Sequence, residues 1–435
     1  MNSTSRPTRT LPADSLAASL LDAALAVAGV LQGEALDDAF GHVTAQSANS
    51  AAVRDLAYQC LRAHAGIEGR LAVLVPKPLR ETDRRALLLV ALCRLEARPD
   101  TAHTTVNQAV EAARVLGGDR FGGLMNAVLR NAQRRHTDLD AAVAADLAAR
   151  LQHPRWWLDM LRRDHPEQWQ DIAAQGNSHP PMALRANRRR TTPQQALAQL
   201  QSAGIVAQIR GDDGLLLDKP CPVSRLPGFA EGELSVQDLG AQRAAALLDV
   251  AADQRVLDAC AAPGGKASHL LERAELDLLA LDHSEPRTRR IAENFERLGL
   301  RGRIAVGDAA RPDDWWDGRP FDRILADVPC SASGVVRRHP DAKWLRRPQD
   351  IAGFAAQQRA ILDALWRVLA PGGKLLYATC SVFRAENQDQ VTAFTARHPD
   401  CLRLSPCGAP DLQLLPTAEH DGFYYALLQK TPLAG

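Results

Sequence analysis

Two cysteines follow two segments that the sequence predicts to be buried strands. Cys330 lies in DVPC, after the apolar run 321–326, and Cys380 lies in ATCS, after the run 374–378. Short apolar runs of this kind are typical of the core strands of a parallel sheet. In open α/β sheets, ligands bind at the carboxyl ends of the strands. Two thiols at such ends indicate nucleophilic catalysis, because a thiolate is a strong nucleophile.

For either cysteine alone, packing is the alternative, because free cysteine is among the residues most often buried. The chain has eight cysteines and no C-x-x-C pair, so we expect neither a zinc site nor a disulfide scaffold. The choice between packing and catalysis therefore depends on the motifs around the two thiols.

The composition is that of a globular protein with several domains. A chain of 435 residues with 46% hydrophobic and 24% charged residues predicts about two to four domains. Residues 1–10 are polar, and no apolar run approaches the ~20 residues needed to span a bilayer. We therefore expect a cytoplasmic monomer with no membrane and no metal partner. The net charge of +1 does not by itself indicate a nucleic-acid-binding protein. A nearly neutral protein can still bind RNA if its arginine clusters converge on one face.

The hydrophobic pattern divides the chain into three parts. Residues 11–150 predict helices throughout, because Ala and Leu dominate and capping residues precede the periodic runs. From 153 to about 236, short alternating strands and one helix predict a small α+β module. From 238 onward, strands and helices alternate, which predicts a mostly parallel sheet covered on both faces. We therefore predict an all-α domain (1–145), linker helices with an α+β module (146–237) and a Rossmann-like α/β domain (238–435).

Within the last part, each expected element has its own apolar run. Strands are expected at 255–259, 276–281, 303–306, 321–326 and 374–379, with a final antiparallel strand at 423–428. Helices are expected at 266–273, 285–298, 349–369 and 386–397.

A glycine-containing loop, DACAAPGGK at 258–266, joins the first of these strands to its helix. Glycines let a backbone approach a ligand closely, and the start of a helix offers free N–H groups. The loop matches neither common nucleotide motif. Cys260 replaces the first glycine of G-x-x-x-x-G-K-[ST], Ala267 replaces its last residue, and G-x-G-x-x-G is absent.

Acidic residues end the next two expected strands. Asp282 lies 17 residues after Gly265, close to the spacing of an acid that binds ribose hydroxyls. Asp308 is placed to accept a hydrogen bond from an adenine amino group. Capping of the following helix is the alternative for both aspartates. Acids near a glycine loop suit a nucleoside with a cationic centre and would repel a pyrophosphate, so the expected cofactor is S-adenosylmethionine.

In combination, these motifs resemble a known family. The segments 258–266, DVPCSASG at 327–334 and TCS at 379–381 are similar to motifs of the RsmB/NOP family of RNA cytosine-5 methyltransferases, which use S-adenosylmethionine. The resemblance covers residues 180–430. TVNQAVE at 105–111 and NAVLRN at 126–131 look like a NusB-like RNA-binding domain. That fusion resembles the bacterial enzymes of the family that act on small-subunit (16S) ribosomal RNA.

The resemblance implies a role for each motif. Cys380 would be the nucleophile and Cys330 would serve product release, while Ala261, Ala262 and Val328 are permissible variants of the family motifs. The implied cofactor-binding residues are Cys260, Ala261, Ala262, Pro263, Gly264, Gly265, Lys266, Asp282, Asp308 and Asp327.

The chemistry explains why two thiols are needed. Carbon 5 of cytosine is a poor nucleophile, and addition of a thiolate to carbon 6 converts the ring into a reactive enamine. Asp327, in protonated form, could donate to nitrogen 3, and Cys330 could remove the carbon 5 proton so that Cys380 leaves. The target base must leave its stack, so the substrate is unpaired RNA. We expect the helical domain and the residues around 185–190 to grip it.

Other functions remain open at this point. A DNA cytosine-5 methyltransferase uses a Pro-Cys thiol, which Cys330 would supply, but the second thiol at Cys380 disfavours DNA. Transfer RNA is the alternative substrate for an RNA enzyme. A different class is a non-catalytic RNA-binding, antitermination-like factor with a vestigial methyltransferase fold.

Overall fold

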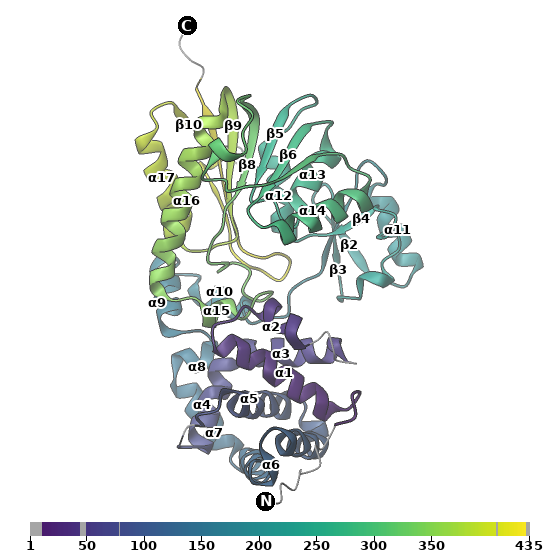
Figure 1. The fold of residues 1–435 in the computed structure, drawn as a ribbon, viewed down its shortest axis with the longest axis vertical. Helices are drawn as coiled ribbons and strands as arrows, with labels where there is room; N and C mark the ends of the chain where they lie inside the picture. The colour runs from purple at the N-terminus through teal and green to yellow at the C-terminus, as the bar shows by residue number, and fades with distance from the viewer. Residues whose placement is uncertain (1–10, 44–48, 78, 406–407, 432–435) are drawn as a thin grey trace, which may run out of the picture. The chain divides into compact units, whose positions relative to one another are not determined.

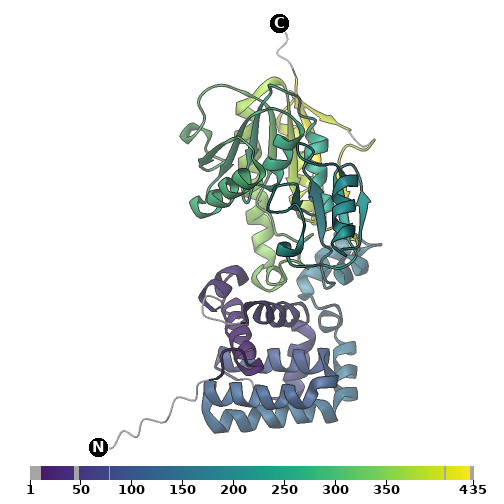
Figure 2. The same cartoon turned by 90° about the vertical axis from the view of Figure 1, so that its right-hand side faces the viewer.

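A computed structural model describes residues 11–43, 49–77, 79–405 and 408–431. The chain divides into a helical unit, residues 1–177 with 336–347, and a sheet unit, residues 178–335 with 348–435 (Figures 1 and 2). The parts of the predicted all-α domain at 1–10, 44–48 and 78 lie outside the described residues. In the part of the chain that the structure describes, no helix is long and apolar enough to cross a membrane.

The helical unit is a bundle of helices (Figure 2), and one of them is buried over its middle turns. In α5 (Thr82–Ala97), every residue from Ala86 to Leu92 is buried, so apolar packing surrounds the helix. The other long helix, α6 (Ala102–Arg134), changes direction at Gly117 and at Gly118, where φ is 73°. The remaining helices are α1 (Leu16–Leu31), α2 (Leu36–Val43), α3 (Ser50–Arg62), α4 (His64–Leu74), α7 (His136–Ala145), α8 (Leu147–Leu151), α9 (Arg155–Asp164) and α10 (Trp169–Gln175).

The helical unit also contains a segment from far along the chain. Residues 336–347, with the short helix α15 (Ala342–Leu345), pack against its core. The Trp344 indole N–H donates to the Leu61 carbonyl oxygen at 2.8 Å. Lys343 Nζ donates to the Asn177 side chain at 2.7 Å, and burial lowers the pKa of Lys343 to about 7. Residues 178–335, more than a third of the chain, therefore separate two parts of one unit.

The α+β module forms the first part of the sheet unit. Its antiparallel sheet has the order β2-β3-β1-β4. Its elements are β1 (Ala183–Ala186), α11 (Pro193–Ser202), β2 (Ala207–Arg210), β3 (Gly214–Leu217) and β4 (Leu234–Val236). Thr192 and Gln195 form a capping box at the start of α11, with Pro193 in the first turn. The predicted succession of strand, helix and two strands is confirmed.

The large sheet has the strand order β10-β12-β9-β8-β5-β6-β7, with β11 beside β12. Strands β5 to β9 pair in parallel and β12 is antiparallel to β9. The strands are β5 (Arg255–Ala259), β6 (Asp277–Asp282), β7 (Arg303–Val306), β8 (Phe321–Asp327), β9 (Leu369–Thr379), β10 (Cys401–Leu404), β11 (Leu412–Leu414) and β12 (Phe423–Lys430).

Helices cover both faces of this sheet (Figure 1). On one face lie α12 (Leu239–Leu248), α13 (Gly265–Arg273) and α14 (Glu285–Leu298), and on the other α16 (Pro348–Val368) and α17 (Gln388–Arg397). The 3₁₀ turn η5 (Arg384–Glu386) precedes α17. From β5 the chain continues to β6 on one side and later returns through β8 on the other. Ligands bind at such a reversal, beside the carboxyl ends of the strands.

Candidate active site

The two predicted thiols lie side by side at that edge of the sheet. β8 and β9 pair with Asp327 opposite Ala378, so the loops that follow both strands leave the sheet together. The Sγ atoms of Cys330 and Cys380 are 3.3 Å apart, and both cysteines are free. The Gly334 amide donates to the Cys380 carbonyl oxygen at 2.8 Å. The structure thus brings together the two residues that the sequence singled out for chemistry.

The contact between the two thiols disfavours the thiolate form of Cys330. The hydrogen bond with Cys380, and then burial, keep the pKa of the Cys330 thiol well above its usual range. Either sulfur can be the donor of this contact. A thiolate at this position is a strong nucleophile and could attack an electrophilic carbon.

Asp282 supports the cofactor loop, residues 258–266, by a hydrogen bond to the loop backbone. This carboxylate is 1% exposed, and it accepts from the Ala262 amide at 3.0 Å and the Ser284 amide at 3.1 Å. Gly264 has φ 96°, and a Cβ there would lie 3.1 Å from the Ile291 side chain, so glycine fits this close approach. Asp282 is therefore a buried support of the loop as well as the cap of the next turn.

A cavity of about 160 Å³ opens beside this loop. It is lined by Cys260, Asp282, His283, Gly307, Asp308, Ala309, Pro329, Gln357 and Ile361. Three predicted cofactor residues, Cys260, Asp282 and Asp308, thus share one cavity with Pro329, the neighbour of Cys330. The sequence reasoning missed Gln357 and Ile361 of α16. The only sequence signal for these two residues is their spacing of four, which places both side chains on one face of a helix.

A buried aspartate stands at the start of the cofactor loop. Asp258, the last but one residue of β5, is completely buried, and both of its carboxyl oxygens lack a hydrogen-bond partner among the described residues. Burial, and then the charge of Asp327, raise the pKa of Asp258 well above its usual range, while the charge of Lys266 lowers it only in part. An unsatisfied buried carboxylate is costly, so the protonated form of Asp258 is favoured here.

Lys266 and Asp327 form an ion pair between the cofactor loop and the end of β8. Lys266 Nζ donates to Asp327 Oδ2 at 2.7 Å. Burial by itself would lower the pKa of Lys266, but the Asp327 carboxylate, followed by the charge of Cys380, raises it above the usual value. Asp327 was expected as a protonated donor. In this structure it accepts, and the proton donor beside it is the Lys266 ammonium.

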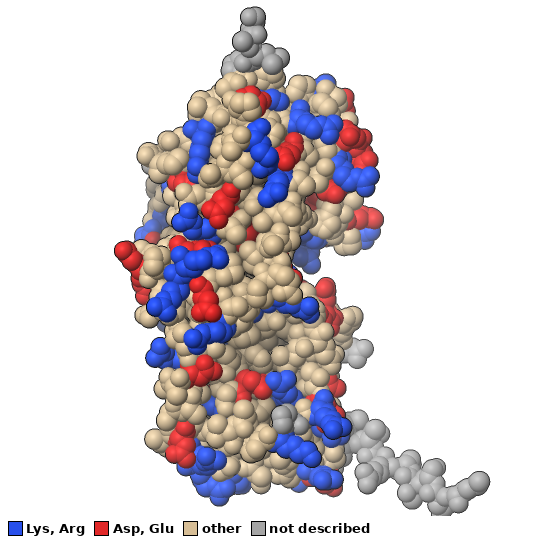
Figure 3. Space-filling model, turned by 90° about the vertical axis from the view of Figure 1, so that its left-hand side faces the viewer, with Lys and Arg blue, Asp and Glu red and all other residues tan. Residues whose placement is uncertain are grey.

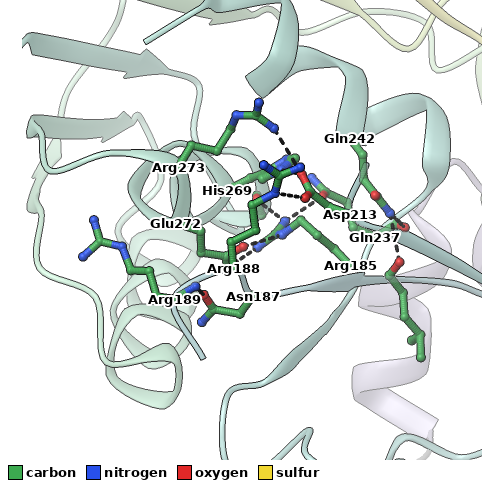
Figure 4. A network of polar contacts seen from close by, with 12 residues as sticks. Arg185, Asn187, Arg188, Arg189, Asp213, Gln237, Gln242, His269, Glu272 and Arg273 are labelled. Atoms are coloured by element: carbon green, nitrogen blue, oxygen red, sulfur yellow. Dashed lines mark hydrogen bonds and ion pairs between the residues drawn. The ribbon is translucent and has the colours of Figure 1, made fainter. Parts of the chain in front are cut away.

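The α+β module is attached to the cofactor loop through Arg185 (Figure 4). The Arg185 guanidinium donates to both Glu272 carboxylate oxygens at 2.8 and 2.6 Å and to the Gly265 carbonyl oxygen at 2.9 Å. Arg185 is 1% exposed and Glu272 4%. One side chain of β1 therefore contacts both the first residue and the last turn of α13.

The burial of Arg185 removes this residue from the segment 185–190 that was expected to grip RNA, while for the exposed Arg188, Arg189 and Arg190 that expectation stays a prediction. Arg185 is buried, Arg188 bonds Asp213, and Arg189 pairs with Glu275 at 2.5 Å. Arg190 donates to the Glu231 carbonyl oxygen. These arginines form contacts that hold the module together. The sequence did not predict these contacts, because the partners lie in segments far from the arginine run. On the face in Figure 3, basic and acidic side chains are interspersed within each unit.

Among the residues with described positions, no group of three or more His, Cys, Asp or Glu side chains is arranged to hold a metal ion. The seven described cysteines are all free.

Comparisons with known proteins agree with this architecture. A family described as 16S rRNA methyltransferase RsmB/F matches residues 245–429. An RsmF/B-like ferredoxin-like domain matches 153–224, and the NusB family matches 8–134. The fold and the site thus define a Rossmann-like methyltransferase domain joined to a ferredoxin-like module and a NusB domain. The chain belongs to the 16S rRNA methyltransferase RsmB/F family.

Similarity extends over nearly the whole chain. Ribosomal RNA small subunit methyltransferase B of Vibrio cholerae is 47% identical over 387 residues, which cover 87% of this chain and 89% of that protein. The protein of the same name from Serratia proteamaculans is 41% identical, with 94% of this chain and 97% of that protein covered. The crystal structure of PH0851 superposes with a TM-score of 0.77 at 22% identity, covering 97% of this chain and 100% of that one, which shows likeness of fold. The predicted family and fold class are confirmed.

Proposed function

We propose that this protein transfers a methyl group from S-adenosylmethionine to carbon 5 of a cytosine in 16S ribosomal RNA, through a covalent bond between Cys380 and the base. Membership of the family makes the chain a methyltransferase dependent on S-adenosylmethionine. The observation that carries the covalent route is the thiol pair, with sulfurs 3.3 Å apart, beside the cavity of the cofactor loop.

Each residue of the site has a part in this route. S-adenosylmethionine, when bound, supplies an electrophilic methyl group. Cys380 adds to carbon 6 of the cytosine and makes carbon 5 nucleophilic. Asp327, which accepts from Lys266 before the reaction, takes a proton from that ammonium and donates to nitrogen 3 as electron density moves into the ring. Hydrogen bonding at this position stabilises the charge that develops in the ring.

Release of the product requires the second thiol. After methylation, carbon 5 carries both a methyl group and a proton, and the bond to Cys380 cannot break until the proton is removed. Once Cys380 is bonded to carbon, it no longer holds a proton to share with Cys330, whose sulfur is 3.3 Å away before the reaction. Cys330 then releases its own proton to solvent and takes the one from carbon 5. The electrons of that carbon–hydrogen bond restore the ring double bond as Cys380 leaves as a thiolate.

The cofactor would be held by the loop 258–266 and by three aspartates. Asp282 and Asp308 line the cavity and would bind the ribose hydroxyls and the adenine amino group, while Asp327 stands at the thiol end. The backbone from Cys260 through Ala261, Ala262, Pro263, Gly264 and Gly265 to Lys266 would face the remainder of the molecule. The glycines allow that approach because they present no Cβ.

The parts outside this site would bind the RNA. We infer that the NusB-like domain, predicted at 1–145, holds the ribosomal RNA, and that the segment 146–237 supports the catalytic domain at 238–435. We infer a cytoplasmic location from this proposed activity, because ribosomal RNA is a cytoplasmic substrate in bacteria. The monomeric state stays a prediction, which sedimentation of the pure protein would test.

Mapping of 5-methylcytosine in cells that lack the protein tests the function directly. We expect one 16S ribosomal RNA position to lose its methyl group and to regain it with the native gene but not with Cys380→Ala. Loss from transfer RNA instead would support the transfer RNA alternative. Unchanged methylation of all RNA, with RNA binding retained, would support the non-catalytic RNA-binding factor.

Changing Asp282 to asparagine tests the cofactor part of the site. Asparagine keeps only one acceptor for the Ala262 and Ser284 amides, so the loop loses a hydrogen bond to a charged group, worth about 1.5–3 kcal/mol. We expect S-adenosylmethionine to bind roughly 10 to 100 times more weakly in a calorimetric titration. The matched control is Glu285→Gln, whose side chain is 68% exposed on the same loop and helix. A folded Asp282→Asn protein with native affinity would remove Asp282 from the cofactor site.

A further inference from the structure

One buried carboxylate touches the loops of both thiols. Glu386, at the end of η5, is 0% exposed. Its Oε1 accepts from the Ser331 amide at 2.7 Å, and its Oε2 accepts from the hydroxyls of Ser331 and Ser381, both at 2.6 Å. Ser331 follows Cys330 and Ser381 follows Cys380. A single side chain therefore holds the residue next to each thiol.

The groups around Glu386 match its ionised form. Gln358 Nε2 adds a longer contact to Oε1 at 3.4 Å and also donates to the Pro329 carbonyl oxygen at 2.9 Å. All the groups that bond the carboxylate are donors, so a proton on it would displace one of them. Burial raises the pKa of Glu386 above its usual value, and the hydrogen bonds from Ser331 and Ser381 oppose that rise only in part.

Further hydrogen bonds close the two loops onto each other. The Ser333 and Ser381 hydroxyl oxygens are 2.9 Å apart, and the Val382 amide donates to Ser333 Oγ at 2.8 Å. Asn387 bonds both sides of Cys380, through the Thr379 hydroxyl at 2.6 Å and the Ser381 carbonyl oxygen at 2.8 Å. Each serine hydroxyl thus has a partner, so this network can hold one geometry.

Among the described residues, the Glu386 carboxylate has no counterion. Of the side chains in the described ranges, no Lys, Arg or His forms an ion pair with Glu386, in contrast to Glu272, which Arg185 neutralises. A buried charge that only neutral donors solvate reduces folding stability. Such a cost is expected where the group sets a geometry that function needs.

We propose that Glu386 is a positioning residue that fixes the separation of the Cys330 and Cys380 thiols. This inference rests on the proposed function, in which the two sulfurs act on adjacent carbons of one cytosine ring. Cys380 must reach carbon 6 while Cys330 faces the proton on carbon 5. Ser331 and Ser381 directly follow the two cysteines. By binding both serines, the Glu386 carboxylate sets the positions of the two sulfur atoms relative to carbons 5 and 6 of the ring. A displacement of about 1 Å can cost roughly 10²-fold in rate.

Glu386→Gln is the test variant. The amide keeps one acceptor oxygen but turns an NH₂ group toward serine donors, so the two loops separate. We expect kcat for RNA methylation to fall by about 10 to 100-fold, with KM for RNA and for S-adenosylmethionine within about twofold of native. The control is Asp389→Asn, three residues further on, whose side chain is 58% exposed. It should retain the native rate.

A second readout measures the thiol geometry without any methylation. Diamide oxidises two neighbouring thiols to a disulfide and is itself reduced to the hydrazine, which takes up the two hydrogens. Peptide mass spectrometry should show a Cys330–Cys380 disulfide that forms quickly in the native protein and about tenfold more slowly in Glu386→Gln. Ser381→Ala, which keeps the carboxylate and removes one donor, should show the same change to a smaller degree. It replaces Glu386→Gln if that variant does not fold.

The outcomes separate the two proposals. A folded Glu386→Gln protein with the native kcat and the native rate of disulfide formation would overturn the positioning role. Failure of the covalent mechanism would show differently, as native activity of Cys380→Ala. The disulfide measurement would then still decide whether Glu386 holds the two thiols together.

Discussion

Cys330→Ala is expected to form a covalent protein–RNA complex that survives denaturation. Without the second thiol, Cys380 can still add to the base, but no positioned base removes the carbon 5 proton. General bases contribute about 10² to 10⁴-fold, so turnover should fall by that amount while the first methyl transfer persists. A denaturing gel with labelled 16S ribosomal RNA fragment and S-adenosylmethionine would show the complex as a slowly migrating band.

Two further variants make this result specific. Cys330→Ala combined with Cys380→Ala should form no complex, because no nucleophile remains. Cys401→Ala, a change of a free cysteine on β10, should behave like the native protein. A covalent complex from Cys380→Ala, and none from Cys330→Ala, would exchange the roles of the two thiols and match the arrangement of the DNA enzymes.

Arg185→Met should strongly destabilise the sheet unit. It leaves the Glu272 carboxylate buried without its bidentate partner and removes the hydrogen bond to the Gly265 carbonyl oxygen. Breaking a buried ion pair by removing one partner costs about 3–5 kcal/mol of unfolding free energy. Because a chain with several domains does not unfold in one step, hydrogen exchange of β5 and β6 peptides in urea would measure it for this unit.

An exposed ion pair nearby supplies the control for that experiment. Arg189 pairs with Glu275, whose side chain is 81% exposed, so Arg189→Met should change stability by less than about 1 kcal/mol. Arg185→Met combined with Glu272→Leu should recover most of the loss, since no unpaired charge remains. If Arg185→Met cost no more than Arg189→Met, the module would not be held by this ion pair.

The sequence predicted those elements whose signals are local. β5, β7 and α14 begin and end where they were expected, because turn residues flank each of them. Gly299, with φ 67°, ends α14. β9 begins at Leu369, although a helix was expected through that residue. The strand extends because Leu369 pairs with Phe321 across a register irregularity, a tertiary contact that no local signal contains.

The site was predictable to the extent that it follows the ends of parallel strands. Cys330, Cys380, Asp282 and Asp308 all lie where strand ends meet, and that position follows from the alternation of strands and helices. Side-chain partners do not follow from it. The link of Arg185 to the cofactor loop and the position of Glu386 between the thiols depend on how separate elements pack.

The attacking sulfur can be identified with 16S ribosomal RNA fragments that contain 5-fluorocytidine at the target position. Fluorine at carbon 5 cannot be removed as a proton is, so the native protein remains bonded to the base after methyl transfer. Digestion and mass spectrometry of the complex would then locate the linked residue. We predict the link at Cys380. A link at Cys330, or methylation of ordinary RNA without any link in the fluorinated RNA, would contradict the covalent mechanism described here.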